Sequence, residues 1–481
     1  MSWSRREVLA SLGVASAQAI LWACGGQAHT PRRKLMEDPQ VRTWLHDAVE
    51  RLKGAGFTNA HVLAVSRQRM TAAVDVLGAG VARAQADGVV ITVRERDGSV
   101  REHVTNDLSR EGIAAATRVL AGAARPASVD FGRAPAPLHV ANPEPGLLSD
   151  GQLLARVGAL ALRDRDVSSR IVYSAAVLDI DDATVWSVAP GRDLAQRLVR
   201  VRQSLTRVAW NGSQPVVSEA AHAWSGSIDA QELSQAEIVA VEDNALELMT
   251  PRPFDDREYQ VALEPEVAAS VIDVAVRSLL TSTASKRPEV ARRLAIGANV
   301  VAPIVTLVDD PGVAHAYGGF AFDDEGEPAR AIKLIERGQI VGRLEDRGGG
   351  RGRRPGHVGV LEPAPSHLRI EPGAVDEGAL LESGFVLEGP LGTVVDPTSD
   401  RVVIAVARAR EWAGGKRTGR VFANVELAGE LGKLLASITA ISKQARAIGF
   451  RDELAGEPRW RSIETPWLRA RGLLRTRRRP T

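Results

Sequence analysis

The sequence contains very little cysteine, few aromatic residues and almost no excess charge. A single cysteine among 481 residues excludes an intramolecular disulfide, and its position at residue 24 argues against a role in a folded metal site. Aromatic residues make up only 4% of the chain, so we expect an aliphatic core. The 61 basic and 59 acidic residues leave a formal charge of +2, which gives no reason to expect a nucleic-acid partner.

What the chain does contain is typical of a soluble globular protein. Hydrophobic residues make up 44% and charged residues 25%, unlike a disordered or a polytopic membrane protein. The length exceeds that of one ordinary core, and a usual domain size of about 150 residues predicts two or three domains.

The first 24 residues have the features of an export signal. Arg5 and Arg6 form a twin-arginine pair, and the modestly apolar residues 8–23 are too few to span a bilayer, which needs about 20. Residues 21–25 resemble a lipobox, in which Cys24 is acylated; a chance cysteine near an ordinary cleavage site is the alternative. We therefore expect export by the twin-arginine route to the periplasmic side, and a lipoprotein anchored in the membrane through Cys24.

Turn signals and periodicity divide the rest of the chain. After a polar tether at 25–40, a first α/β subdomain at 41–123 and a central subdomain at 149–250 are separated by a proline-rich linker. The C-terminal domain at 251–475 has more strands than helices, and a basic tail follows at 476–481. This pattern favours an α+β fold over a doubly wound sheet. Helices are expected at 41–53, 109–120, 151–163, 234–250, 265–280 and 430–441, and strands at 61–67, 73–78, 88–95, 100–104, 170–178, 184–188, 193–208, 214–224, 259–263 and 304–308, with a hairpin at 331–341.

Several short segments of the chain, taken in their order along the sequence, resemble the TldD/PmbA family, whose members are described as metallopeptidases and modulators of DNA gyrase. No single segment is diagnostic, but their order and spacing, from about residue 45 to 475, are together specific. The resemblance implies N-terminal α/β subdomains followed by a strand-rich C-terminal domain that carries a central helix. The segments are residues 56–60, 105–109, 261–265, 304–310, 322–328, 334–338, 370–373, 378–381 and 427–438.

The resemblance also implies where a metal would be held. Active members carry His-Glu-x-x-x-His on the helix after the 261–265 segment, and a late cysteine completes the zinc site. The matching positions here are Ile272, Asp273 and Arg277, no shift of register supplies a histidine, and no cysteine follows residue 24. Arg277 would bring a fixed positive charge to the place of a ligand. We therefore expect no metal, no cofactor and no catalytic residue of the family type.

The family offers a role for such a chain. By resemblance, its active subunit works with a partner that lacks the metal motif, in a hollow dimer that admits unfolded peptides. We accordingly expect a pseudoenzyme that pairs with a metal-bearing TldD-type paralogue, or with itself, and holds a peptide substrate. Two alternatives stay open: an active peptidase that binds zinc through unrecognised ligands, and a non-enzymatic peptide-binding lipoprotein of the envelope.

Three further groups of residues are candidates for binding. Arg351, Arg353 and Arg354 lie in the glycine-rich loop 348–356, which could bind a phosphate or a peptide carboxylate near the substrate channel, or simply be mobile. The acidic residues at 309–310 and 323–325 could hold calcium or magnesium, or could be turn carboxylates. The histidines at 315, 357 and 367 show no ligand spacing and are expected to be structural.

Overall fold

The protein consists of a long curved sheet with a second, strand-rich domain above it. The computed structural model describes residues 39–476, apart from 124–137, 142–147, 163–169, 211–214, 248–254, 346–347, 355, 358, 397 and 455–456. Arg5, Arg6, Cys24 and residues 477–481 of the basic tail therefore lie outside the described residues. Among those described, no helix combines the length and the apolar character needed to cross a membrane.

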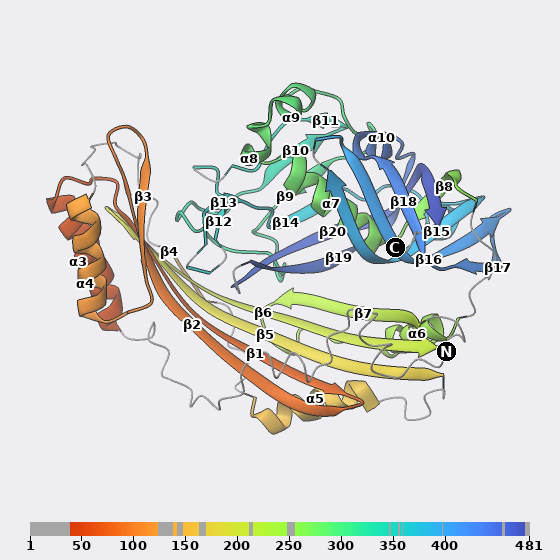
Figure 1. The fold of residues 1–481 in the computed structure, drawn as a ribbon, viewed down its shortest axis with the longest axis horizontal. Helices are drawn as coiled ribbons and strands as arrows, with labels where there is room; N and C mark the ends of the chain where they lie inside the picture. The colour runs from red at the N-terminus through yellow and green to blue at the C-terminus, as the bar shows by residue number, and fades with distance from the viewer. Residues whose placement is uncertain are drawn as a thin grey trace, which may run out of the picture.

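The first sheet has seven strands in the order β3-β2-β1-β5-β6-β4, with β7 paired to β6 (Figure 1). Two long antiparallel hairpins, β1–β2 and β5–β6, form most of it, and both predicted N-terminal subdomains contribute strands to it. Its elements are α3(Pro39–Gly54), β1(His61–Asp75), β2(Gly78–Arg94), β3(Val100–Thr105), α4(Arg110–Ala123), β4(Leu138–Ala141), α5(Asp150–Leu162), β5(Ile171–Ala189), β6(Arg192–Trp210), β7(Pro215–Ser225) and α6(Gln235–Leu246).

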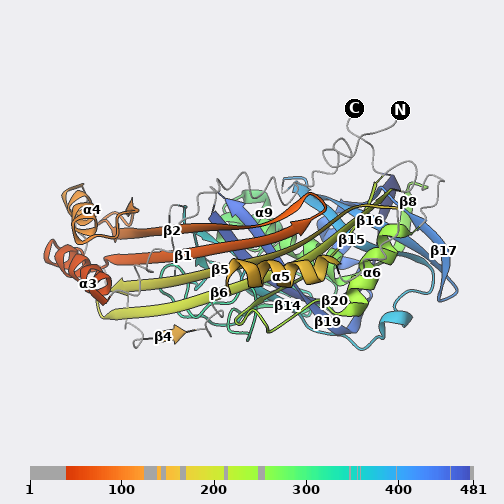
Figure 2. The same ribbon diagram turned by 90° about the horizontal axis from the view of Figure 1, so that it is seen from below.

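Apolar cores hold helices against both ends of this sheet. At one end, α3 and α4 lie side by side and bury Leu45, Leu52 and Ile113 with the start of β1 (Figure 1). Nearer the other end, α5 runs along the strands, as Figure 2 shows from below, and buries Leu153 and Val157. Two mainly aliphatic clusters therefore hold these helices against the sheet, in agreement with the low aromatic content.

The strands are longer than the sequence predicts. The expected breaks at 68–72 and 179–183 do not exist, because β1 and β5 run through both ranges in unbroken register. Asp181 and Asp182, which lie in the second of these ranges, are both buried within β5. Asp182 is paired with Arg197 on the neighbouring strand at 2.9 Å, so a cross-strand cation compensates its charge. Strand β4 also lies within the range predicted to be a linker.

The second sheet has eleven strands and surrounds α7. Its order is β11-β10-β9-β14-β20-β18-β16-β15-β8, with β17 on β16, β19 on β20 and a further pairing of β8 with β20. The elements are β8(Arg257–Leu263), α7(Pro265–Leu279), α8(Ser282–Ser285), α9(Pro288–Arg293), β9(Leu307–Asp309), β10(Ile332–Glu336), β11(Gln339–Ile340), β14(His367–Ile370), η2(Glu377–Ala379), β15(Gly384–Asp396), β16(Arg401–Ala413), β17(Lys416–Phe422), β18(Val425–Glu430), α10(Leu431–Ala436), β19(Ala440–Leu454) and β20(Glu457–Thr476), besides the small pair β12(Gly352–Arg353) and β13(Glu362–Pro363).

One helix of this domain is shorter than predicted. The apolar residues of 430–441 suggested a continuous amphipathic helix, but α10 ends at Ala436 and β19 begins at Ala440. Ile441 then belongs to the hairpin of β19 and β20, where it pairs with Leu468. The mixture of helices and mainly antiparallel strands confirms the α+β class.

The β19–β20 hairpin reaches down to the long sheet (Figure 1). Trp460 of β20 lies under two guanidinium groups of that sheet, with Arg67 4.6 Å and Arg200 4.5 Å from the ring centroid. Arg200 is fully buried and donates to the backbone oxygens of Tyr317 at 2.9 Å and Gly319 at 3.2 Å. These cation–π and charged hydrogen bonds fix the two domains against each other.

Candidate functional site

Helix α7 carries the residues that the sequence singled out, and its sequence explains why it forms. Pro265 occupies the first turn, where a missing N–H costs nothing, and alanine and valine fill the following turns. The helix is buried on nearly all sides by the surrounding strands, chiefly β15, β20 and β19. Ile272 is part of the core, whereas Asp273 points an almost fully buried carboxylate toward β20.

Asp273 is held by two guanidinium groups. Arg461 of β20 contacts both of its oxygens, with Nη2 to Oδ2 at 2.8 Å, and Arg277, one turn along α7, donates from Nε to Oδ2 at 3.0 Å. Arg461 also binds Asp452 of β19, which lies 3.5 Å from Arg277. The four side chains, Asp273, Asp452, Arg277 and Arg461, form a closed network that we call the α7 ion-pair network.

The charges of this network cancel within it. Two carboxylates face two guanidinium groups, and the guanidinium of Arg461 further lies over the ring of Phe450 at 5.4 Å. Burial alone would raise the pKa of Asp452, but hydrogen bonds and positive charge from Arg461, with Arg277 behind it, hold that pKa below its ordinary value. The carboxylates are therefore neutralised by protein groups and present no net negative charge to a bound cation.

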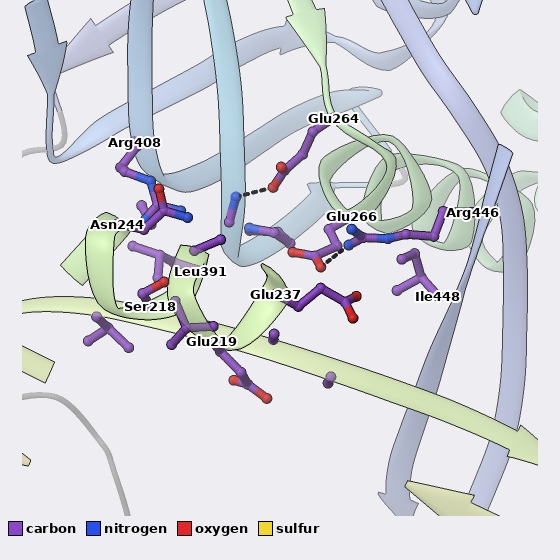
Figure 3. A pocket seen from close by; sticks show the side chains of 18 of the residues that line it. Ser218, Glu219, Glu237, Asn244, Glu264, Glu266, Leu391, Arg408, Arg446 and Ile448 are labelled. Carbon is purple, nitrogen blue, oxygen red and sulfur yellow. Dashed lines mark hydrogen bonds and ion pairs between the residues drawn. The ribbon is translucent and has the colours of Figure 1, made fainter. Parts of the chain in front are cut away.

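A cavity of about 310 Å³ opens beside the N-terminal end of α7, between the two domains (Figure 3). Its walls come from β6, β7 and α6 on one side and from α7, β15, β16 and β19 on the other. Phe450 lines it, so the cavity adjoins the α7 ion-pair network. Its volume lies within the range of roughly 300–1,000 Å³ that is usual for ligand pockets.

The cavity is lined by carboxylates and guanidinium groups that are mostly paired. Glu219 is bound by Arg202 at 2.7 Å. Glu266 is bound by Arg446, as Figure 3 shows. Glu264 differs, because its Oε1 accepts a hydrogen bond from the backbone N–H of Gly389. Burial, reinforced by the negative charges of Glu266 and Glu388, raises the pKa of Glu264 to about 8.

The arginines of the glycine-rich loop are used inside the protein. Arg351 is fully buried against Asp309, and its Nη2 donates to the backbone oxygen of Arg330 at 2.7 Å. Arg354 binds Glu102 of β3 and so ties the loop to the long sheet, with Nη1 to Oε2 at 2.9 Å. The guanidinium of Arg353 lies over the ring of Phe320, 4.6 Å from its centroid. A role of this loop in a substrate channel stays a prediction.

The acidic segments and the histidines are placed as structural groups. Asp323 accepts from the backbone N–H groups of Glu325 at 3.0 Å and Glu327 at 2.9 Å, as a turn carboxylate does. His367 bonds Ser462 at 2.8 Å within the core. Across the described ranges, no three histidine, cysteine, aspartate or glutamate side chains are grouped so that they could hold a metal ion.

Comparisons with known proteins agree with this architecture. Residues 256–475 match the model of the PmbA/TldA metallopeptidase C-terminal domain. A metalloprotease of Methanocaldococcus jannaschii is 26% identical over 215 residues, covering 42% of this chain and 47% of the relative, so the chain spans about half the length of this curated protein. The resemblance of residues 256–475 to the C-terminal domain of the TldD/PmbA family is therefore confirmed.

Solved structures extend the likeness to the whole fold. A Bacteroides thetaiotaomicron protein described as a modulator of DNA gyrase superposes with a TM-score of 0.68 at 15% identity, covering 91% of this chain and 99% of the other. TldE from Thermococcus kodakarensis gives a TM-score of 0.67 at 16% identity, covering 90% and 99%. The predicted TldD/PmbA fold is therefore confirmed along nearly the full chain.

For a TldD/PmbA member, the decisive question is whether α7 can hold zinc. Zinc sites in proteins use imidazole, thiolate or carboxylate ligands in a set of three or four. At the positions that the resemblance assigns to the ligands, Ile272 is packed in the core and Arg277 is itself a cation, while Asp273 is bound by two guanidinium groups. These residues do not fit a zinc ion.

The network contains two residues that the sequence did not reveal. Arg461 and Asp452 lie about 180 residues beyond α7, and no sequence motif marks them. Their place beside Asp273 and Arg277 is therefore known only from the fold. Glu264 was noted as part of a family segment, but its hydrogen bond comes from Gly389, whose φ is 65° and which lies 125 residues further along the chain.

Proposed function

We propose that this protein is an exported, catalytically silent TldD/PmbA member that serves as the peptide-holding partner of a metal-bearing paralogue. The observation that carries this proposal is the α7 ion-pair network. It occupies the position that the resemblance gives to the zinc site, and its charges are already balanced. A member that cannot activate water through zinc retains the fold, and thus the capacity to shape a chamber with a second subunit.

The remaining features fit this role. The twin-arginine pair Arg5–Arg6 and the lipobox at Cys24 support a site of action on the periplasmic side, attached to the membrane, and an exported protein would not meet DNA. Folding before export, which the twin-arginine route permits, allows a complex to assemble first. The cavity beside α7 supplies a place at which a peptide can be held.

The pairing is tested by co-expression of the tagged full chain with a family member from the same genome that carries an intact His-Glu-x-x-x-His motif. We expect the two chains to elute together at equal stoichiometry in size-exclusion chromatography. The same experiment with the partner's motif glutamate replaced by glutamine is the control, because pairing must not depend on proteolysis. A stable monomer or a self-dimer in the presence of excess partner would contradict the proposal.

A further inference from the structure

Glu264 stands out among the carboxylates that line the interdomain cavity. Each of the others has a basic partner: Glu219 has Arg202, Glu266 has Arg446, and Glu237 has His222 at 2.7 Å. In the described part of the chain, the only hydrogen-bond partner of the Glu264 side chain is the backbone N–H of Gly389, which donates to Oε1. Its second oxygen, Oε2, has no hydrogen-bond partner among the residues that the structure describes.

The local backbone fixes Glu264 in this position. It occupies the N-cap of α7 but makes no side-chain cap bond to the helix, so its carboxylate is turned away from the helix end. Gly389 precedes an irregularity in the pairing of β15 with β16, where the register shifts between Pro390 and Gly392. The turn presents one N–H to the carboxylate, and Figure 3 shows Glu264 directed toward the space above Glu266.

The rest of the lining defines what could complement this carboxylate. Val217, Leu391, Ile448 and Phe450 supply apolar walls, while the three guanidinium groups of the lining, on Arg202, Arg408 and Arg446, each have a carboxylate partner. A metal ion is disfavoured, because no group of three suitable ligands occurs among the described residues. A small organic cation on a hydrocarbon stem matches both the free carboxylate oxygen and the apolar walls.

We propose that Glu264 anchors a protonated primary amine of a bound peptide, supplied either by the amino terminus or by a lysine side chain. This inference deepens the proposed function and rests on it, since it names the group by which the chain holds its peptide. The raised pKa of Glu264 agrees with a buried carboxyl that has no ion-pair partner among the described residues, and a bound ammonium lowers that pKa by stabilising the ionised form.

Fluorescence anisotropy with three C-terminally labelled, unstructured peptides tests the inference on the full chain. The first has a free amino terminus and no lysine, the second is the same peptide acetylated at the amino terminus, and the third is acetylated but contains one lysine. We expect the first or the third to bind at least about tenfold more tightly than the second, as a charge-assisted hydrogen bond provides. Preference for the first identifies the amino terminus as the source, and preference for the third identifies lysine.

Two variants locate the effect. Glu264→Gln keeps the shape and the bond from Gly389 but removes the charge, and it is expected to abolish the tenfold preference. Glu219→Gln alters a carboxylate of the same cavity that already has Arg202 as partner, and it should retain the preference. Should Glu264→Gln fail to fold, the comparison of the three peptides on the unaltered chain still decides.

Equal binding of all three peptides, or binding of none, overturns the inference. So does a Glu264→Gln variant that keeps the full preference. These outcomes are separate from failure of the proposed function: a chain that pairs with its metal-bearing paralogue but does not distinguish amines retains the function and loses only the anchor. A chain that distinguishes amines but never pairs loses the partner role.

Discussion

Replacement of Arg461 by methionine is expected to lower the free energy of unfolding of the C-terminal domain by about 3–5 kcal/mol. Arg461 is 6% exposed and is the main partner of Asp273, which is 3% exposed. Methionine fills much of the same space but leaves a buried carboxylate with Arg277 alone, whose side chain is 42% exposed. Urea unfolding followed by tryptophan fluorescence measures the loss, since Trp460 is the adjacent residue.

Two further variants show whether the loss arises from an uncompensated charge. Arg277→Met removes the more exposed of the two cations of the network and should cost no more than about 1 kcal/mol. The double variant Asp273→Leu with Arg461→Met removes the buried charges together, and it is expected to recover much of the stability lost by Arg461→Met. If Arg461→Met unfolds at the same urea concentration as the unaltered chain, the network does not hold α7 as described.

Replacement of Glu264 by glutamine is expected to stabilise the protein at alkaline pH and to have little effect at acid pH. The pKa of Glu264 is about 8 in the folded protein, against an ordinary value of 4.5. The folded state therefore holds this proton while the unfolded chain releases it, so stability falls as pH rises from about 4.5 to 8. Glutamine cannot ionise, and above pH 8 the variant should be more stable by up to about 5 kcal/mol, since the two pKa values differ by 3.5 units and each unit corresponds to about 1.4 kcal/mol.

Thermal unfolding of both proteins between pH 5 and pH 9 measures this difference. Glu219→Gln serves as the control, because Glu219 is already bound by Arg202 and should give no gain that grows with pH. A Glu264→Gln advantage that is constant from pH 5 to pH 9 would mean that the carboxyl titrates normally. The same result would mean that Glu264 is not a buried carboxylate lacking an ion-pair partner, and it would weaken the case that the cavity binds an amine.

The sequence predicts much of this fold because its local signals agree with the final structure. The capping box of α6, in which Ser234 and Glu237 bond reciprocally, marks a helix start that the pattern also gives. Pro265 does the same for α7. The turn at Arg337–Gly338, both with positive φ, lies in the predicted hairpin. Short-range chemistry of this kind is visible before any tertiary contact is known.

What the sequence could not show depends on contacts between distant residues. The unbroken strand β5 was not predicted across 179–183, where Asp181 and Asp182 lie, because the arginines that face these carboxylates belong to other strands and cannot be assigned without the sheet. The end of α10 is decided by the pairing of β19 with β20, not by its own apolar pattern. The sequence shows directly that the zinc motif is missing. It does not show the ion pairs that occupy its place, because Arg461 comes 188 residues after Asp273.

At the position that the family resemblance gives to zinc, α7 holds an ion-pair network. Elemental analysis of the full chain, purified after expression with zinc present, tests it most directly, with the metal-bearing paralogue prepared in parallel as the control. We predict less than about a tenth of an equivalent of zinc per chain, because its ligand positions do not provide a set that binds the ion. Close to one equivalent would contradict the account and require a search for other ligands and for peptidase activity.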